Sequence, residues 1–248
     1  MRAALITGAA KRLGAEMAKH LIEEGWSVGI HYNTSEGEAE RIAQLARDKG
    51  LTAKTYAYDL SQPDAPEALV DQFLEDFPGA YLLINNAAIF HRDTIQNFSK
   101  KLFYDHILLN TLVPTLLIQR FAEKKTDDIC VINMLDQKVE NITPDYFSYT
   151  VSKLALHNIT RMTAMALWPH CRVNGVAPGL TLRSGDQTEE EFEKAFTRTP
   201  LGVGPTVEEI CQAVSLIANT SSITNQIIVL DGGRHMLTKF PFDDLPKE

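Results

Sequence analysis

Short apolar runs alternate with longer amphipathic segments along nearly the whole chain. The apolar runs predict seven strands, at 3–7, 27–32, 52–58, 81–85, 129–133, 172–176 and 226–230. The amphipathic segments predict helices near 13–24, 37–48, 65–76, 98–121, 146–167 and 206–218. Parallel strands joined by helices need right-handed crossovers, which place helices on both faces of one sheet. The order of elements therefore predicts an α/β fold built on a doubly wound parallel sheet.

The chain shows no repeat, low-complexity stretch or linker that would divide it. Its 248 residues are a routine length for one α/β domain, so we expect a single domain over residues 1–248. Segment 180–205 departs from the regular alternation, carries the acidic run Glu189-Glu190-Glu191, and falls where a parallel sheet forms its ligand crevice. We expect this segment to cover a site, with a domain boundary as the alternative.

Charge and cysteine content narrow the choice of partner. The net charge of −8 disfavours nucleic acid and anionic membrane surfaces. No apolar run approaches the roughly 20 residues of a membrane span, and the first seven residues read as a strand rather than a signal peptide. Cys130, Cys171 and Cys211 are scattered, which favours neither a disulfide framework nor a metal site. We expect a cytoplasmic, metal-free protein that acts on a small molecule.

A glycine-containing turn follows the first predicted strand. Its sequence is Thr7-Gly8-Ala9-Ala10-Lys11-Arg12-Leu13-Gly14, and a helix is predicted directly after it. Glycines at such a turn let the backbone approach a pyrophosphate, which then sits on the helix N-terminus. Candidate cofactor contacts are Gly8, Lys11, Arg12, Leu13 and Gly14, although a plain structural turn also fits two glycines. With a nucleotide-binding turn, the predicted sheet is of the Rossmann type.

The second predicted strand ends in the polar run His31-Tyr32-Asn33-Thr34-Ser35. Binders of NAD usually carry an acidic residue here, which accepts hydrogen bonds from the ribose hydroxyls. This chain has no carboxylate before Glu36, while Lys11 and Arg12 could pair with an extra phosphate, so the run favours NADP(H). A loop in which Ser35 caps the next helix is a compatible alternative. The remaining predicted cofactor contacts at strand ends are Asp59, Leu60, Asn86 and Ala87.

Tyr149 and Lys153 are four residues apart in a predicted helix, and Asp136 precedes Tyr149 by thirteen residues. Side chains four apart lie on one helix face, about 5–6 Å from each other. The free phenol has a pKa of about 10, and a nearby ammonium favours the phenolate, which brings proton transfer toward neutral pH. The same spacing occurs by chance on exposed helices. Its position downstream of the glycine turn favours a proton-donating role.

These motifs stand in the order typical of short-chain dehydrogenases/reductases, and the chain resembles that family over nearly its whole length. The ordered residues are Thr7-Gly8 with Gly14, Asp59, Asn85-Asn86-Ala87, Asn110, Tyr149 with Lys153, Pro178-Gly179 and Asp231-Gly232-Gly233. The resemblance implies that Tyr149 donates a proton, that Lys153 holds the nicotinamide ribose and lowers the phenol pKa, and that Asn110 anchors a relay water. It also implies cofactor contacts from Pro178, Gly179 and Thr181, and a homotetramer.

One position departs from the family's usual pattern. A serine normally stands two residues after the asparagine of the fifth strand, but here Asn133 is followed by Met134, Leu135 and Asp136. An ionised aspartate only accepts hydrogen bonds, so it suits the amino and ring N–H groups of a pterin rather than a ketone oxygen. A degenerate site in which Asp136 only forms a turn is one alternative. A protonated Asp136 that feeds Tyr149 is another.

Arg12 in place of a middle glycine, together with Asp136, is similar to pteridine reductases. Phe90 falls where those enzymes stack an aromatic ring on the pterin, with simple packing as the alternative role. Ala88 and Thr34 depart from the serine and arginine common in that group. The ending Asp231-Gly232-Gly233-Arg234-His235 resembles the dihydromonapterin reductase branch. The predicted substrate contacts are Arg12, Ala88, Phe90, Asp136 and Tyr149.

The sequence as a whole predicts an NADPH-dependent pteridine or dihydromonapterin reductase. Hydride would reach a ring C=N carbon, and Tyr149 would protonate the ring nitrogen. A short-chain carbonyl or 3-oxoacyl thioester reductase is the alternative enzyme. A non-catalytic NADP(H)-binding sensor is a third hypothesis. The presence of Tyr149, Lys153 and Asn110 together counts against it, because binding alone does not need the acid.

Overall fold

Seven parallel strands form one sheet in the computed structural model, which describes residues 2–124, 128–183 and 187–237. The strands are β1 (Ala3–Ile6), β2 (Ser27–Tyr32), β3 (Ala53–Ala57), β4 (Ala80–Asn85), β5 (Ile129–Met134), β6 (Cys171–Pro178) and β7 (Ile227–Leu230). Their order in space is β3-β2-β1-β4-β5-β6-β7. The predicted strands and the Rossmann-type α/β class are confirmed.

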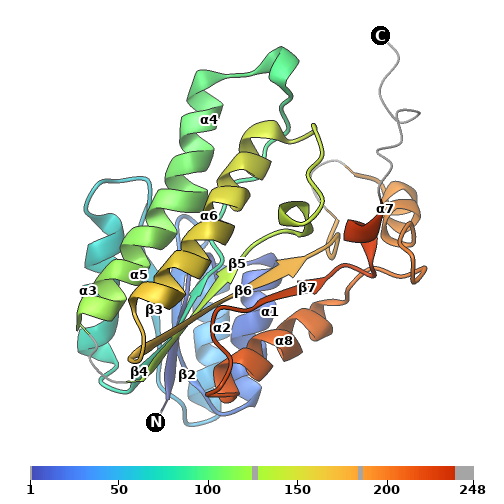
Figure 1. Cartoon of the computed structure of the whole chain (residues 1–248). Coiled ribbons are helices and arrows are strands. Elements are labelled where there is room, and N and C mark those ends of the chain that lie inside the picture. Colours follow the sequence, from blue (N-terminus) through green and yellow to red (C-terminus); the bar gives the residue numbers. More distant parts are fainter. Residues whose placement is uncertain (1, 125–127, 184–186, 238–248) are drawn as a thin grey trace.

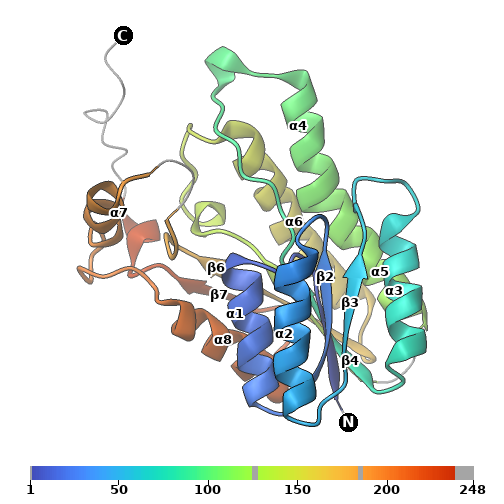
Figure 2. The same cartoon turned by 180° about the vertical axis from the view of Figure 1, so that it is seen from behind.

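Helices cover both faces of the sheet (Figures 1 and 2). One face carries α1 (Arg12–Glu23), α2 (Glu36–Asp48) and α8 (Val207–Asn219), and the other carries α3 (Ala65–Asp76), α5 (Val113–Lys124) and α6 (Phe147–Ala166). Each layer has its own apolar core. On one face, Ile30 of β2 packs with Met17 and Leu21 of α1. On the opposite face, Leu83 of β4 packs with Phe73 of α3 and Phe121 of α5. All six side chains are fully buried. Burial of side chains this large contributes about 1.5–3 kcal/mol each.

The strand order reverses between β1 and β4, and this reversal positions the candidate site. The helices that follow these two strands leave on opposite faces, so a crevice opens at the carboxyl ends of the strands. Asn85 at the end of β4 donates to Oδ1 of Asn133 on β5 at 2.8 Å, and Asn133 in turn donates to Thr160 of α6 at 2.8 Å. These buried bonds fix α6 to β4 and β5.

The helix predicted at 98–121 is built differently. It begins as α4 (Lys100–Ile107), passes through a π-helical turn, η2 (Leu108–Leu112), and continues as α5. The Val113 N–H bonds to the carbonyl of Leu108, five residues back, and Pro114 has no N–H to donate to the carbonyl of Asn110. Turns of this kind are frequent at functional sites, and this one contains Asn110.

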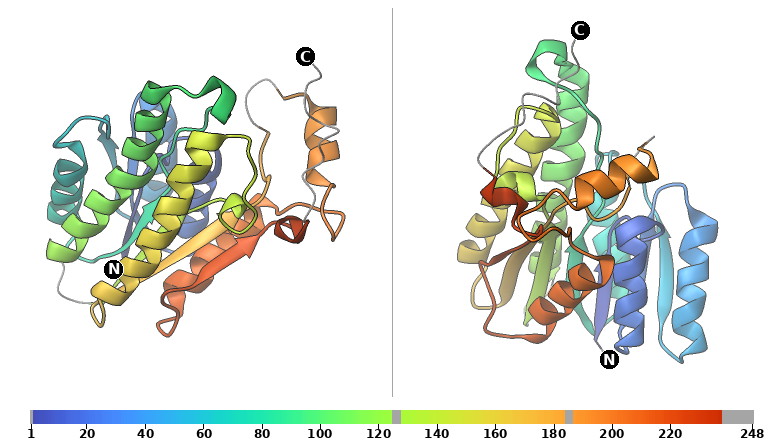
Figure 3. Two further views of the ribbon diagram at one scale, coloured as in Figure 1. Left: turned by 45° about the horizontal axis from the view of Figure 1, so that its top comes forward. Right: turned by 90° about the vertical axis from the view of Figure 1, so that its right-hand side faces the viewer.

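Segment 180–205 contains a helix that the alternation of apolar runs did not predict, α7 (Glu189–Phe196). A capping box starts it, in which Thr188 accepts from the Glu191 N–H while the Glu191 carboxylate accepts from the Thr188 N–H. Figure 3 shows α7 beside the short turn η4 (Arg234–Met236), near the carboxyl end of β7. Arg234 joins them by donating to the carbonyl of Ala195 at 2.9 Å.

Within the described ranges, none of the helices is both long and apolar enough to span a membrane. The three cysteines are buried free thiols.

Candidate active site

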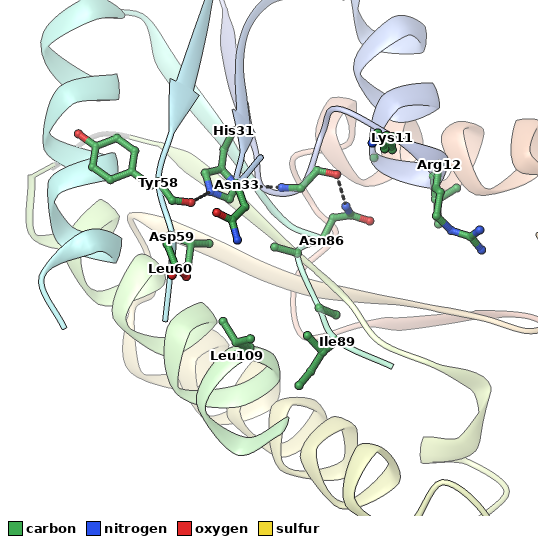
Figure 4. Close-up of a pocket in the computed structure, with 15 residues that line it drawn as sticks. Lys11, Arg12, His31, Asn33, Tyr58, Asp59, Leu60, Asn86, Ile89 and Leu109 are labelled. Atoms are coloured by element: carbon green, nitrogen blue, oxygen red, sulfur yellow. Dashed lines mark hydrogen bonds between the residues drawn. The ribbon is translucent and has the colours of Figure 1, made fainter. Parts of the chain in front are cut away.

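A cleft of about 400 Å³ opens at the carboxyl ends of β1 to β4 (Figure 4). It is lined by Gly8, Lys11, Arg12, Leu13, Gly14, His31, Asn33, Tyr58, Asp59, Leu60, Asn86, Ala87, Ala88, Ile89 and Leu109. Twelve of these fifteen residues are predicted cofactor or substrate contacts. Tyr58, Ile89 and Leu109 were missed, although each directly neighbours a predicted residue in the sequence.

The glycine turn fits its place because a side chain at either glycine would collide with its neighbours. Gly8 has a φ of +62°, and a Cβ added there would lie 3.0 Å from the Cα of Ala87. A Cβ on Gly14 would lie 2.3 Å from the Gly8 carbonyl oxygen. These close approaches bring the N-terminus of α1 to the cleft, where the first N–H groups of a helix have no partner within the helix.

Asn86 and Thr7 hold that turn against the loop after β4. The Asn86 amide donates to the carbonyls of Thr7 at 2.9 Å and Gly8 at 3.1 Å. The Thr7 hydroxyl oxygen accepts from the backbone N–H groups of Asn86 and Ala87. The side chains of Asn86 and Thr7 therefore hold the backbone that forms the cleft wall.

His31 links the glycine turn to the loop after β3. Its Nδ1 accepts from the Gly8 N–H at 3.0 Å, and its Nε2 donates to the carbonyl of Tyr58 at 3.0 Å (Figure 4). This pattern requires the neutral ring, and burial lowers the pKa of His31 to about 4. Since both ring nitrogens are used within the protein, His31 shapes the cleft wall.

Lys11, Arg12 and Asn33 provide polar groups at the rim of the cleft. Lys11 Nζ lies 3.3 Å from a carboxylate oxygen of Glu38, and Arg12 is exposed with a φ of +54°. In Figure 4, Arg12 lies across the cleft from Tyr58. Tyr32, Thr34 and Ser35 fall outside the cleft lining, and Ser35 stands at the N-cap of α2 without a capping side-chain hydrogen bond.

Pro178, Gly179 and Thr181 also lie outside this lining, at the end of β6. The Gly179 N–H donates to the carbonyl of Leu230 at 2.7 Å, and the Thr181 hydroxyl donates to the carbonyl of Gly179 at 3.0 Å. The structure thus places these predicted cofactor contacts beside β7.

Tyr149 and Asp136 meet directly. The Tyr149 hydroxyl donates to Oδ2 of Asp136 at 3.0 Å, while Oδ1 of Asp136 accepts from the Lys138 N–H at 2.9 Å and begins the short turn η3 (Gln137–Val139). Leu135 is buried among Val139, Leu156 and Ala177, so it packs in the core. Asp136 therefore occupies the polar position beside the phenol.

Burial dominates the electrostatics of this pair. It raises the pKa of Asp136, against the opposing effects of the Lys138 N–H and the Tyr149 hydroxyl. Burial, followed by the Asp136 carboxylate, raises the pKa of Tyr149 well above its ordinary value. The net shift of the Tyr149 pKa is therefore opposite to the lowering expected from Lys153, because desolvation and the Asp136 carboxylate both disfavour the phenolate.

Lys153 lies on the same helix face as Tyr149, as predicted, with its ammonium 5.8 Å from the centre of the phenol ring. Its Nζ donates to the carbonyl of Met134 at 2.6 Å. Burial lowers the pKa of Lys153 to about 8, with Asp136 acting in the opposite direction. The lysine is therefore a buried cation that loses its proton far more readily than a surface lysine.

Asn110 is fully buried in η2. Its Oδ1 accepts from the Ile89 N–H at 2.9 Å, and its Nδ2 donates to the Ile89 carbonyl at 3.0 Å and to the Ser152 hydroxyl at 3.1 Å. The side chain thus joins the loop after β4 to α6. The relay-water role that the resemblance implies stays a prediction.

Phe90 lies outside the cleft lining and is 43% exposed. Its ring stacks on Tyr146 with centroids 4.3 Å apart and an interplanar angle of 8°. It also makes an edge contact with Tyr149, at 4.6 Å and 81°. An exposed aromatic ring thus stands next to the predicted proton donor, backed by a second ring.

A doubly wound sheet with a glycine turn, a cleft at the strand ends and a buried Tyr149–Lys153 pair defines a dinucleotide-binding oxidoreductase. A family model described as enoyl-(acyl carrier protein) reductase matches residues 8–235. The chain belongs to this family of short-chain dehydrogenases/reductases.

Several relatives resemble the chain over nearly its full length. Pteridine reductase 1 of Leishmania tarentolae is 28% identical over 278 residues, which cover 93% of this chain and 95% of the relative. Dihydromonapterin reductase of Citrobacter koseri is 25% identical over 240 residues, covering 94% and 96%. The crystal structure of FolM alternative dihydrofolate reductase 1 from Brucella suis, in complex with NADP, matches with a TM-score of 0.91 and 36% identity over 96% of each chain.

Proposed function

We propose that the protein is an NADPH-dependent pteridine reductase that reduces a ring C=N bond of a dihydropterin. The observation that carries the proposal is the contact between Asp136 and the Tyr149 hydroxyl. It places an acceptor-rich carboxylate beside the proton donor, where a ketone reductase needs a donor for the substrate oxygen. The relatives named for pteridine, dihydromonapterin and dihydrofolate reduction support the same substrate class.

The cofactor is NADP(H). A cleft of about 400 Å³ with the N-terminus of α1 at its floor fits a pyrophosphate. Asn33, the residue after β2, lines the cleft where NAD binders usually carry an acid, and Lys11 also lines the cleft. The NADP bound in the Brucella suis structure is in line with this assignment.

When bound, NADPH supplies the hydride. Tyr149 holds its proton at neutral pH, because its pKa is raised, and donates that proton to the ring nitrogen. Lys153, which carries its charge below about pH 8, stabilises the oxygen of Tyr149 as the proton leaves. Phe90 offers its exposed ring as the stacking surface for the flat substrate.

Asp136 can serve the reaction in two ways. As a carboxylate it accepts hydrogen bonds from the amino and N–H groups of the pterin. Its raised pKa also supports a protonated form, which would return a proton to Tyr149 through their 3.0 Å hydrogen bond. Arg12 and Ala88, at the rim of the cleft, complete the proposed substrate contacts.

A short-chain carbonyl or 3-oxoacyl thioester reductase is the second candidate, since Tyr149 and Lys153 would serve a ketone equally well. The family model that matches the chain is itself described by an acyl-carrier substrate. NADPH oxidation should be followed with dihydromonapterin, dihydrobiopterin, dihydrofolate, a 3-oxoacyl thioester and a simple diketone. The proposal predicts the highest kcat/KM for a dihydropterin, and a higher value for the thioester would overturn it.

The assembly we propose is a homotetramer. Exposed apolar side chains on one side of α6 and just beyond its end support burial between copies, namely Met162, Met165 and Trp168. Light scattering coupled to size exclusion tests this point, and a monomer at micromolar concentration would contradict it.

A further inference from the structure

The segment that follows β4, residues 86–93, is hydrogen-bonded at Ile89 and His91 to side chains of η2 and α4. Asn110 pairs with the backbone of Ile89, and Nε2 of the buried His106 accepts from the His91 N–H at 3.3 Å. Phe90, between these two bonded positions, reaches the phenol ring of the proposed proton donor. This segment therefore carries the proposed stacking surface, and its path depends on Asn110 and His106, two buried side chains outside the cleft lining.

Asp93 makes the next attachment, and it connects this segment to α6. Asp93 is only 2% exposed. Its Oδ1 accepts from the Ser148 N–H at 2.9 Å, and its Oδ2 accepts from the Ser148 hydroxyl. The Asp93 carbonyl accepts from the Phe147 N–H at 3.1 Å. The first N–H groups of the helix are thus satisfied from a residue 55 positions earlier in the chain.

Asp93 takes the place of the helix's own N-cap residue. Tyr146 holds that position, but it has a left-handed φ of +53° and makes no capping hydrogen bond from its side chain. A carboxylate at a helix N-terminus also interacts favourably with the positive end of the helix dipole. The cap lies next to Ser148, which directly precedes Tyr149 in the helix. Any loosening of the cap therefore moves the turn that carries the phenol.

We propose that Asp93 is a positioning residue that holds Tyr149 and Phe90 in one fixed geometry. A single carboxylate anchors the segment that carries the stacking ring and also the helix turn that carries the proton donor. The inference rests on the proposed function for the roles of those two residues. It adds that their alignment is set by Asp93, through its bonds to the backbone and hydroxyl of Ser148.

Asp93→Ala, Asp93→Asn and Ser148→Ala test this proposal, with Thr206→Ala as the matched control. Thr206 starts α8 with a capping box, accepting from the Glu209 N–H at 3.2 Å, on the opposite face of the sheet. Asp93→Ala and Thr206→Ala each remove a helix cap, so each should lower Tm by about 2–4 °C. Steady-state kinetics are measured with NADPH and 7,8-dihydrobiopterin well below Tm, and the Kd for NADPH is measured by fluorescence.

Asp93→Ala should lower kcat about 10- to 100-fold and raise KM for the pterin, because a small misplacement of reacting groups is that costly. The Kd for NADPH should stay within about twofold, since the cleft floor keeps its bonds. Asp93→Asn retains one acceptor oxygen and should fall between Asp93→Ala and wild type. Ser148→Ala should add little in the Asp93→Ala background, as expected for partners in one interaction.

The proposal is overturned if Asp93→Ala keeps kcat and KM within about twofold of wild type, or if Thr206→Ala loses as much activity. Should Asp93→Ala not fold, a wild-type kcat and KM in Asp93→Asn would overturn it equally. If the wild type turns over a diketone but no pterin, the proposed substrate is wrong, and the same ratio of variant to wild-type kcat on the diketone still decides the role of Asp93.

Discussion

The hydroxyl of Tyr149 donates a hydrogen bond of 3.0 Å to Oδ2 of Asp136. Burial raises the pKa of each group, and the carboxylate raises that of the phenol further. The phenol therefore holds its proton at neutral pH, as the proposed role of Tyr149 as proton donor requires.

Replacing Tyr149 by Phe should abolish most turnover and leave NADPH binding nearly unchanged, because only the acid is deleted. General acid–base catalysis is worth roughly 10²–10⁴ in rate. Single-turnover kinetics and fluorescence titration of NADPH measure the two quantities separately. If the variant retained more than about a tenth of the wild-type kcat, Tyr149 would not be the proton donor.

Activity should fall as the pH rises through about 8, because the pKa of Lys153 is lowered to about 8 by burial. Below that pH the ammonium is present, and above it the charge beside Tyr149 is lost. The pH profile of kcat/KM measures this loss as its alkaline limb. Lys153→Arg keeps the charge at higher pH and should move the limb upward, whatever its effect on the maximal rate. An unchanged limb in that variant would show that another group titrates.

Asn33→Asp should narrow or reverse the preference for NADPH over NADH. A carboxylate at this cleft position repels the 2′-phosphate and accepts hydrogen bonds from ribose hydroxyls. The ratio of kcat/KM for the two cofactors measures the effect. Asn158→Asp adds the same charge at an exposed position on α6 and should leave the ratio unchanged. Equal kcat/KM with NADPH and NADH in the wild type would show that this cleft does not select the 2′-phosphate.

His31→Phe should weaken NADPH binding by about tenfold, equivalent to about 1.4 kcal/mol, because the Gly8 N–H and the Tyr58 carbonyl lose their shared partner. The kcat at saturating NADPH should change little. His20→Phe, at a partly buried position of α1 near Glu24 and Glu208, is the matched control and should not alter the Kd. A Kd within twofold of wild type for His31→Phe would show that the glycine turn holds its shape alone.

Much of the fold could be predicted because the strands of a doubly wound sheet are buried on both faces and therefore stand out as short apolar runs. The π-helical turn around Asn110 could not, since it reflects a hydrogen bond that Pro114 cannot make and leaves the apolar period nearly intact. Helix α7 is only eight residues long, so it offers few apolar positions from which to recognise a period. Its capping box, Thr188 with Glu191, was the signal available in the sequence.

The candidate site was predictable where neighbours in sequence are also neighbours in space. Tyr149 and Lys153 share a helix face, and Asp136 lies two residues beyond the end of β5, in the segment that leads to their helix. The direction of the phenol pKa shift depends on burial, which spacing does not reveal. The cap provided by Asp93 joins residues 55 positions apart, and no local motif records it.

The central claim, that Asp136 and Phe90 adapt this site to a pterin, is tested most directly by kcat/KM for Asp136→Ala on two substrate classes. Loss of the carboxylate leaves the N–H groups of a pterin unpaired in a dry site, so we predict a far larger loss, of about 10²-fold or more, on 7,8-dihydrobiopterin than on any ketone that the enzyme reduces. Phe90→Ala should raise KM for the pterin alone. An equal loss on pterin and ketone, or a wild type that is faster on 3-oxoacyl thioesters, would contradict the account.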